Sequence, residues 1–186
     1  MKSILINAAI FQVGWLCCVL AGANHLPWLG TASALLIVIW HVLRADNGRK
    51  ELSLVLIVVG IGALWDSLLV YTGLLQYPSG TLINGTAPHW IIAMWALFAT
   101  TLNVSLRWLK YRPLPGAMLG AVSGPAAYFA GYKLGGVQFP DMAAALLALA
   151  GGWAVLMPLL MALSNRFDGK VIQPPHSALA GCNARV

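Results

Sequence analysis

Charged side chains are scarce in this chain. Only 9% of its 186 residues are Asp, Glu, Lys or Arg, whereas a soluble domain carries about 25%. Hydrophobic residues make up 60% of the chain, and the mean hydropathy is +0.79. Such a chain has too few polar residues to cover a soluble core. The composition therefore predicts an integral membrane protein.

Acidic residues are the rarer charged type, with five against eleven Lys and Arg, which gives a net charge of +6. A nucleic-acid reader would gather basic residues in a stripe with interleaved aromatics. Here the basic residues stand at the ends of apolar runs, as topology signals do. We therefore predict no nucleic-acid partner, and we expect membrane lipids and other membrane proteins as partners.

Cysteines and the motifs of soluble enzymes are also nearly missing. Cys17 and Cys18 are adjacent inside an apolar run, and Cys182 lies close to the C-terminus. This spacing matches neither a disulfide framework nor a zinc site. No phosphate-binding loop, nucleophile elbow, HExxH or CxxC motif occurs in the sequence. The sequence predicts no metal and no cofactor.

Six apolar runs are present, each near the length of about 20 residues that crosses a bilayer as a helix. They predict an all-α, polytopic bundle of six transmembrane helices in residues 1–164. A flexible cytoplasmic tail is expected over residues 165–186, which are polar and show no apolar period. The runs cover residues 3–23, 26–43, 52–77, 89–110, 116–134 and 142–164.

The first run has two interpretations. It follows Lys2 and ends in small residues at 21–23, which would also suit a cleaved secretory signal. However, Gly14, Cys18 and Gly22 recur every four residues, and such a stripe lets helices pack closely in lipid. We therefore expect a retained first helix. Cleavage of this run would leave five spans with the same orientation.

The basic residues predict the orientation, because cytoplasmic loops carry an excess of Lys and Arg. If the six runs alternate in direction, ten of the eleven fall on one side and Lys133 alone falls on the other. Both termini are therefore predicted in the cytoplasm, with the uncharged loop 76–89 outside. The ten are Lys2, Arg44, Arg49, Lys50, Arg107, Lys110, Arg112, Arg166, Lys170 and Arg185.

Asp66 is an acid near the middle of the apolar run 52–77, roughly 16 Å from the outer end at Tyr77. An acid at the centre of a span costs about 3 kcal/mol or more, which makes it a candidate functional residue. It could be a neutral, hydrogen-bonded carboxyl that ties helices together. It could equally be a general acid or base facing a lipid-accessible cavity, and ion or proton transit is a third interpretation.

Segments of other runs reach the same depth and are predicted walls of one cavity. On its own run, Asp66 shares a helical face with Gly62, Gly73 and Tyr77, and we expect that face to point inward. The other predicted walls are Gln12 and the segments 95–100, 124–125 and 151–152.

A polar stripe follows the fourth run, where His89, Thr100 and Asn103 fall close to one line with Arg107. His89 is either an interfacial histidine or a group for proton transfer. Trp65 and Trp95 lie too deep for an interfacial belt, so they either pack in the core or line the cavity. The predicted substrate-binding residues are Gln12, Trp65, Tyr77, His89, Trp95, Thr100 and Asn103.

The segment LWDSLLVYTGLLQYPSG, residues 64–80, resembles the small bacterial inner-membrane proteins grouped as domain of unknown function 2878. The similarity of length and span order covers residues 1 to about 165. Since that family has no established activity, the resemblance implies a fold and a location. Its members are often encoded beside proteins similar to cyclopropane-fatty-acid synthases, which would imply lipid modification. The Trp65-Asp66 pair is also loosely similar to integral-membrane terpene cyclases, but no second catalytic carboxyl matches.

These observations favour a membrane protein that modifies or binds a lipid or isoprenoid. In that interpretation Asp66 is the general acid, and Gln12, Trp95 and Thr100 shape the site. The alternatives are a small transporter or channel, and a structural subunit of a membrane complex. A transporter built from inverted repeats should show two similar halves. The segment around Asp66 has no counterpart in the sixth run, which argues against that alternative.

Overall fold

The computed structural model describes residues 2–169, which form six α-helices and one short 3-10 helix. Within this range the only strand-like pairing is an isolated bridge between Gln76 and Gln138. The predicted all-α class is confirmed. The elements are α1 (Lys2–Ala23), α2 (Pro27–Leu43), α3 (Gly48–Tyr71), α4 (His89–Leu102), η1 (Arg107–Leu109), α5 (Pro113–Lys133) and α6 (Met142–Arg166).

Three helices, α1, α3 and α6, are long and apolar enough to cross a membrane, by length and composition. Helices α2 and α4 are apolar but shorter, with 17 and 14 residues. Fourteen residues of α-helix extend about 21 Å, whereas the hydrocarbon core is about 30 Å thick. The helices thus have the character of a membrane protein, with three long candidate spans.

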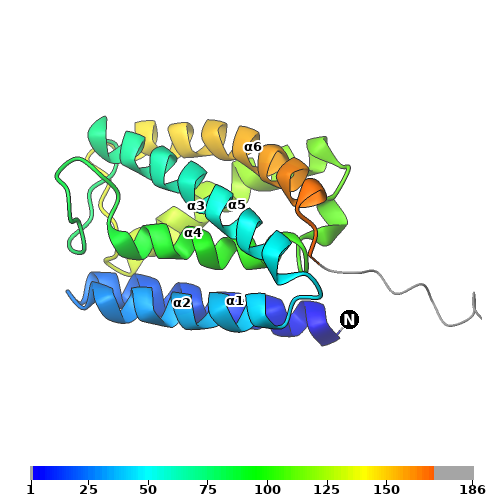
Figure 1. The fold of residues 1–186 in the computed structure, drawn as a ribbon. Helices are drawn as coiled ribbons and strands as arrows, with labels where there is room; N and C mark the ends of the chain where they lie inside the picture. Colours follow the sequence, from blue (N-terminus) through cyan, green and yellow to red (C-terminus); the bar gives the residue numbers. More distant parts are fainter. Residues whose placement is uncertain (1, 170–186) are drawn as a thin grey trace, which may run out of the picture.

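Helix α4 lies at the centre of the bundle. It packs against α1, α2, α3 and α6, and ten of its fourteen residues are buried. Helices α1 and α2 pair on one side of it, and α5 pairs with α6 on the other (Figure 1). The N-terminus and the end of α6 lie at one end of the bundle, and the loop 72–88 lies at the opposite end (Figure 1).

The small-residue stripe of α1 packs inward as predicted, since Gly14, Cys18 and Gly22 are all buried. A Cβ added at Gly14 would lie 2.7 Å from the side chain of Leu97, and one at Gly22 would lie 2.6 Å from the ring of Trp90. Both neighbours belong to α4. The stripe therefore lets α1 approach the central helix closely.

Helix α3 ends at Tyr71, so the predicted continuation to residue 77 is wrong. Gly73 has a φ of 75°, and the Leu74 N–H donates to the carbonyl of Leu69 at 2.9 Å. A left-handed glycine after the last turn is a common helix terminator. At the other end, the side chain of Asn47 caps the helix by accepting from the Lys50 N–H at 3.1 Å.

Helix α4 ends at Leu102, eight residues before the predicted end at Lys110. The hydroxyls of Thr100 and Thr101 donate back to the carbonyls three residues earlier, each at 2.7 Å. Such bonds compete with regular helical hydrogen bonding, and the chain continues in turns and η1. The predicted polar stripe from His89 to Arg107 therefore does not lie along one helix.

The loop 72–88 folds over the end of the bundle. Gln76 and Gln138 exchange backbone hydrogen bonds of 3.0 and 2.8 Å, which fixes this loop to the α5–α6 connection. The Ser79 hydroxyl donates to the carbonyl of Gly22 at 2.6 Å, and Trp90 Nε1 donates to the carbonyl of Ser79 at 3.0 Å. These bonds hold the loop against α1 and α4.

Helix α6 extends to Arg166, two residues beyond the predicted end of the bundle. Residues 167–169 also contact the bundle, since the carbonyl of Gly169 accepts a hydrogen bond from the Asn47 N–H at 3.0 Å. The remaining residues of the predicted tail, 170–186, lie outside the described residues.

Candidate functional site

Asp66 is fully buried, and its carboxyl accepts hydrogen bonds from three aromatic side chains. Trp95 Nε1 donates to Oδ2 at 2.5 Å, and Tyr77 Oη donates to Oδ1 at 3.1 Å. Tyr128 Oη lies 2.8 Å from Oδ1 and 3.0 Å from Oδ2. The three donors come from α4, the loop 72–88 and α5. One acid on α3 therefore joins three other segments.

The described residues provide no positive charge for Asp66. No Lys, Arg or His among residues 2–169 forms an ion pair with it. An indole N–H can only donate, and both tyrosine hydroxyls point their oxygens at the same carboxyl. Both tyrosine hydroxyls can donate to the ionised carboxylate, and either one can accept a hydrogen bond from the protonated acid.

A cavity of about 330 Å³ lies beside these donors. Tyr77, Trp95 and Tyr128 all line it, but Asp66 does not, so the carboxyl lies behind its three donors. Eight of the nineteen lining residues are aromatic, and none carries a formal charge. The six aromatic residues besides the two tyrosines are Phe11, Trp15, Trp90, Trp95, Phe98 and Trp153.

The cavity opens between α1 and α5. Gln12 of α1 and Ser123 of α5 both line it and are both exposed on the surface of the bundle. Within residues 2–169 neither side chain has a hydrogen-bond partner. Both lie in the middle of their helices, so the mouth faces sideways, where a bilayer would present acyl chains.

Glycines make room for the two tryptophans at the back of the cavity. A Cβ added at Gly62 of α3 would collide with the ring of Trp95, and one at Gly124 of α5 would collide with the ring of Trp153. The two rings stack with centroids 5.0 Å apart and planes inclined by 6°. This packing fixes the direction in which Trp95 donates to Asp66.

Of the predicted binding residues, the structure brings Gln12, Tyr77 and Trp95 to the cavity and places the other four elsewhere. Trp65 packs on α6, where its ring occupies the space that a side chain at Gly152 would need. His89 stacks on Trp28 with ring centroids 4.0 Å apart, and its Nδ1 lies 2.7 Å from the hydroxyl of Thr31.

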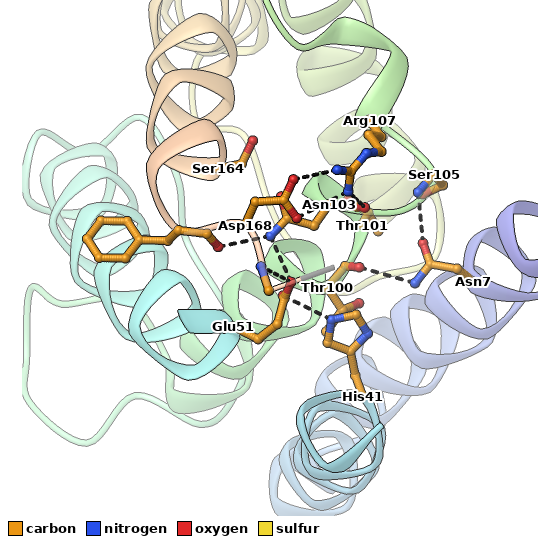
Figure 2. Close-up of polar contacts among 12 residues, drawn as sticks. Asn7, His41, Glu51, Thr100, Thr101, Asn103, Ser105, Arg107, Ser164 and Asp168 are labelled. Carbon is orange, nitrogen blue, oxygen red and sulfur yellow. Dashed lines mark hydrogen bonds and ion pairs between the residues drawn. The ribbon is translucent and has the colours of Figure 1, made fainter. Parts of the chain in front are cut away.

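Thr100 and Asn103 do not line the cavity, and they lie near Asn7 and Glu51 (Figure 2). The carbonyl of Thr100 accepts from Asn7 Nδ2 at 3.2 Å, while its hydroxyl bonds within α4. Asn103 Nδ2 donates to Glu51 Oε1 at 2.8 Å and to the carbonyl of Phe167 at 3.1 Å. Asn103 therefore belongs to a second polar cluster.

This second cluster, which we call the inner network, surrounds the fully buried carboxylate of Glu51 (Figure 2). His41 Nε2 lies 3.2 Å from Glu51 Oε2, and the Gly169 N–H donates to Oε1 at 3.2 Å. The network joins α2, α3, the end of α4 and the end of α6. Its members are His41, Glu51, Asn103, Arg107, Lys110 and Asp168.

Ion pairs extend the inner network. Lys110 Nζ lies 2.7 Å from Asp168 Oδ2 and also donates to Asn103 Oδ1 at 2.7 Å. Arg107 donates to both carboxylate oxygens of Asp168, at 3.1 and 2.5 Å. The chain itself therefore supplies charges of both signs to this cluster.

The sequence did not single out Tyr128 or Glu51. Tyr128 stands in the interior of a predicted run, and its depth is the signal that could have found it. Trp153 lies too deep in its run for an interfacial belt, which predicts a place in the core or at a cavity, and the structure brings it to the cavity. Glu51 lies between the predicted runs 26–43 and 52–77, although Asn47, four residues earlier, is a favourable helix-capping residue. That signal would have placed Glu51 in the first turn of a helix.

The fold and the buried acid define a class: an all-helical protein with membrane-like apolar helices and a carboxyl behind an aromatic cavity. Residues 4–159 match the family described as Protein of unknown function (DUF2878), and the chain belongs to this family. The family resemblance predicted from residues 64–80 is confirmed. A search of the curated proteins and one of the solved structures found no match. The resemblance to terpene cyclases is not shown.

Proposed function

We propose that this protein binds a lipid or isoprenoid in the cavity and modifies it, with Asp66 as general acid. One observation carries the proposal: all three donors to a buried carboxyl line the same apolar cavity. A ligand there would lie against Tyr77 and Tyr128, whose hydroxyls bond Asp66. A proton of Asp66 would pass to a tyrosine oxygen while that tyrosine gives its own proton to the ligand.

The shape of the site supports a ligand taken from the bilayer. The walls are aromatic and aliphatic, and the mouth between Gln12 and Ser123 faces sideways from the bundle. An apolar molecule could therefore enter without crossing water. The two side chains at the mouth could hydrogen-bond a polar group on that molecule, since each has unused donor and acceptor capacity.

The proposal includes a location in a bacterial inner membrane, with six spans and both termini in the cytoplasm. The loop 72–88 would then close the outer end of the bundle, and the inner network would lie at the cytoplasmic end. The excess of Lys and Arg at that end supports this orientation. The short α4 would cross together with the turns and η1 that follow it.

The competing role for Asp66 is structural, because its hydrogen bonds join α3, α4, α5 and the loop 72–88. Asp66→Asn separates the two roles. An asparagine Oδ1 can accept from Trp95 while its Nδ2 donates to a tyrosine oxygen, so folding should be nearly preserved. The titratable proton is lost. We expect cellular lipid composition to change in the Asn variant while its melting temperature in detergent stays close to that of the wild type.

Two further variants complete the experiment. Asp66→Leu leaves three donors without an acceptor and should be destabilised. Glu51→Gln changes a buried acid that does not contact the cavity, so it should leave the lipids as they are in the wild type. A stable Asn variant with unaltered lipids would reject the catalytic role, and a destabilised Leu variant beside it would establish the structural one.

A further inference from the structure

The aromatic cavity and the carboxyl behind it together indicate the charge of the ligand. Asp66 accepts from Tyr77, Trp95 and Tyr128, and neither tyrosine hydroxyl nor the indole N–H has another partner within residues 2–169. Three donors directed at one carboxyl group stabilise its ionised form. The described residues offer no cation to pair with it.

A negative charge without a cation is costly in an apolar interior. Three neutral donors reduce that cost but leave the net charge in place. The space open to a positive group is the cavity itself, on the other side of Tyr77, Trp95 and Tyr128. A cation in the cavity would therefore lie one side chain away from the carboxylate.

The walls of the cavity favour the same ligand charge. The faces of tryptophan, tyrosine and phenylalanine attract cations, and the attraction is strongest where water is excluded. Eight of the nineteen lining residues have such rings. The lining includes no Lys, Arg or His that would repel a cation, and no Asp or Glu that would bind one directly.

We propose that the cavity binds an apolar molecule that carries a positive charge, of the alkyl ammonium class, with Asp66 as its counter-ion. This inference rests on the proposed function, since it names the class of lipid-like ligand for the same cavity. Once Asp66 has given up its proton as general acid, its ionised carboxylate is the counter-ion of the bound cation. The aromatic rings would surround the cationic group, and the alkyl chain would leave through the mouth between Gln12 and Ser123.

Two isosteric probes test the charge directly. N-Dodecylpyridinium carries a planar cation that quenches tryptophan fluorescence, and dodecylbenzene has the same shape without charge. The purified protein in maltoside micelles would be titrated with dodecylpyridinium, and dodecylbenzene would be measured by its competition. We expect the wild-type protein to bind dodecylpyridinium at least tenfold more tightly than dodecylbenzene. Equal affinities would overturn the inference but leave lipid binding intact. Binding of neither probe would contradict the proposed function itself.

Variants then assign the preference to the carboxylate. Asp66→Asn retains every tryptophan, so it also corrects for quenching by probe dissolved in the micelle. The ratio of the two affinities should fall to about one in Asp66→Asn and should be retained in Glu51→Gln. A ratio that persists in Asp66→Asn would overturn the role of Asp66. The ratio of the two affinities in the wild type already tests whether the cavity prefers a cation. The inference can therefore be refuted even if Asp66→Asn does not fold.

The source of such a ligand can be determined by mass spectrometry of protein purified from its native membrane. An ammonium-bearing lipid that is retained by the wild type and depleted in Asp66→Asn would support a source in the bilayer. A wild type that carries no such lipid but prefers the pyridinium would support a cation taken from the aqueous phase.

Discussion

The two fully buried acids of this protein, Asp66 and Glu51, have opposite surroundings. Glu51 lies in the inner network, where an imidazole, an amide and a backbone N–H reach its carboxylate, and Lys110 and Arg107 lie close by on Asp168. Asp66 meets only neutral aromatic donors. One acid belongs to a network that balances its own charges, and the other does not.

This difference separates a structural acid from a candidate functional one. The inner network fills its own space with hydrogen bonds and ion pairs, which is how a buried charge is stabilised within a fold. The donors of Asp66 instead form the wall of a cavity. A charge left to be satisfied by something in a cavity is what a binding site requires, and such residues cluster at functional sites.

The largest expected difference between the cavity end of the bundle and the inner-network end is the side of the membrane on which each lies. If the chain crosses the membrane as proposed, the loop beside the cavity and the basic segment beside the inner network lie on opposite sides. A reporter fused at residue 84 should be periplasmic, and one fused at residue 112 should be cytoplasmic. Finding both reporters on the same side would refute the six-span arrangement.

Removing the acid of the inner network should give the largest loss of stability. Glu51→Leu leaves His41, Asn103 and the Gly169 N–H without their acceptor in a buried place. Breaking a buried charged network from one side costs about 3 to 5 kcal/mol. Unfolding in detergent, followed by circular dichroism, measures the loss. Glu51→Gln keeps the shape and part of the hydrogen bonding, and it should lose less; equal losses would show that packing alone matters here.

Substitution of a glycine of α5 that packs against α6 should cause an intermediate loss of stability. This glycine belongs to one of the helices that form the cavity. A Cβ at Gly120 would collide with the backbone carbonyl of Trp153, so Gly120→Ala must push the two helices apart. Overpacking of this kind costs about 1 to 3 kcal/mol. Gly151→Ala is the matched control, because nothing lies within 4 Å of its added Cβ. If thermal unfolding gives equal melting temperatures for the two variants, the close α5–α6 contact is not part of the folded protein.

The two tyrosines on Asp66 should show the smallest and most graded effect. Tyr128 reaches both carboxylate oxygens, at 2.8 and 3.0 Å, while Tyr77 reaches one at 3.1 Å. A hydrogen bond to a charged group contributes about 1.5 to 3 kcal/mol and a neutral one about 1 kcal/mol. Tyr128→Phe should therefore lower the free energy of unfolding more than Tyr77→Phe does, as measured by thermal unfolding in detergent. The reverse order would show that Tyr77 is the main donor.

The sequence alone determined the class of fold and the unusual position of Asp66. Apolar runs and their lengths depend on local composition, so six helices could be expected, as could the inward stripe at Gly14, Cys18 and Gly22. Helix ends were less certain, because they depend on single residues. The left-handed turn at Gly73 and the side-chain bonds of Thr100 ended two helices earlier than their apolar character predicted.

Only the tertiary structure decided what surrounds each acid. Tyr128 lies 62 residues from Asp66 and Trp95 lies 29 residues from it, and no periodicity relates such positions. Glu51 lies outside the predicted apolar runs, and its partners Asn103 and Gly169 come from distant segments. The hydropathy pattern predicts how far along a helix an acid lies. The donors that reach that acid, and the cavity that those donors line, depend on how separate helices pack together.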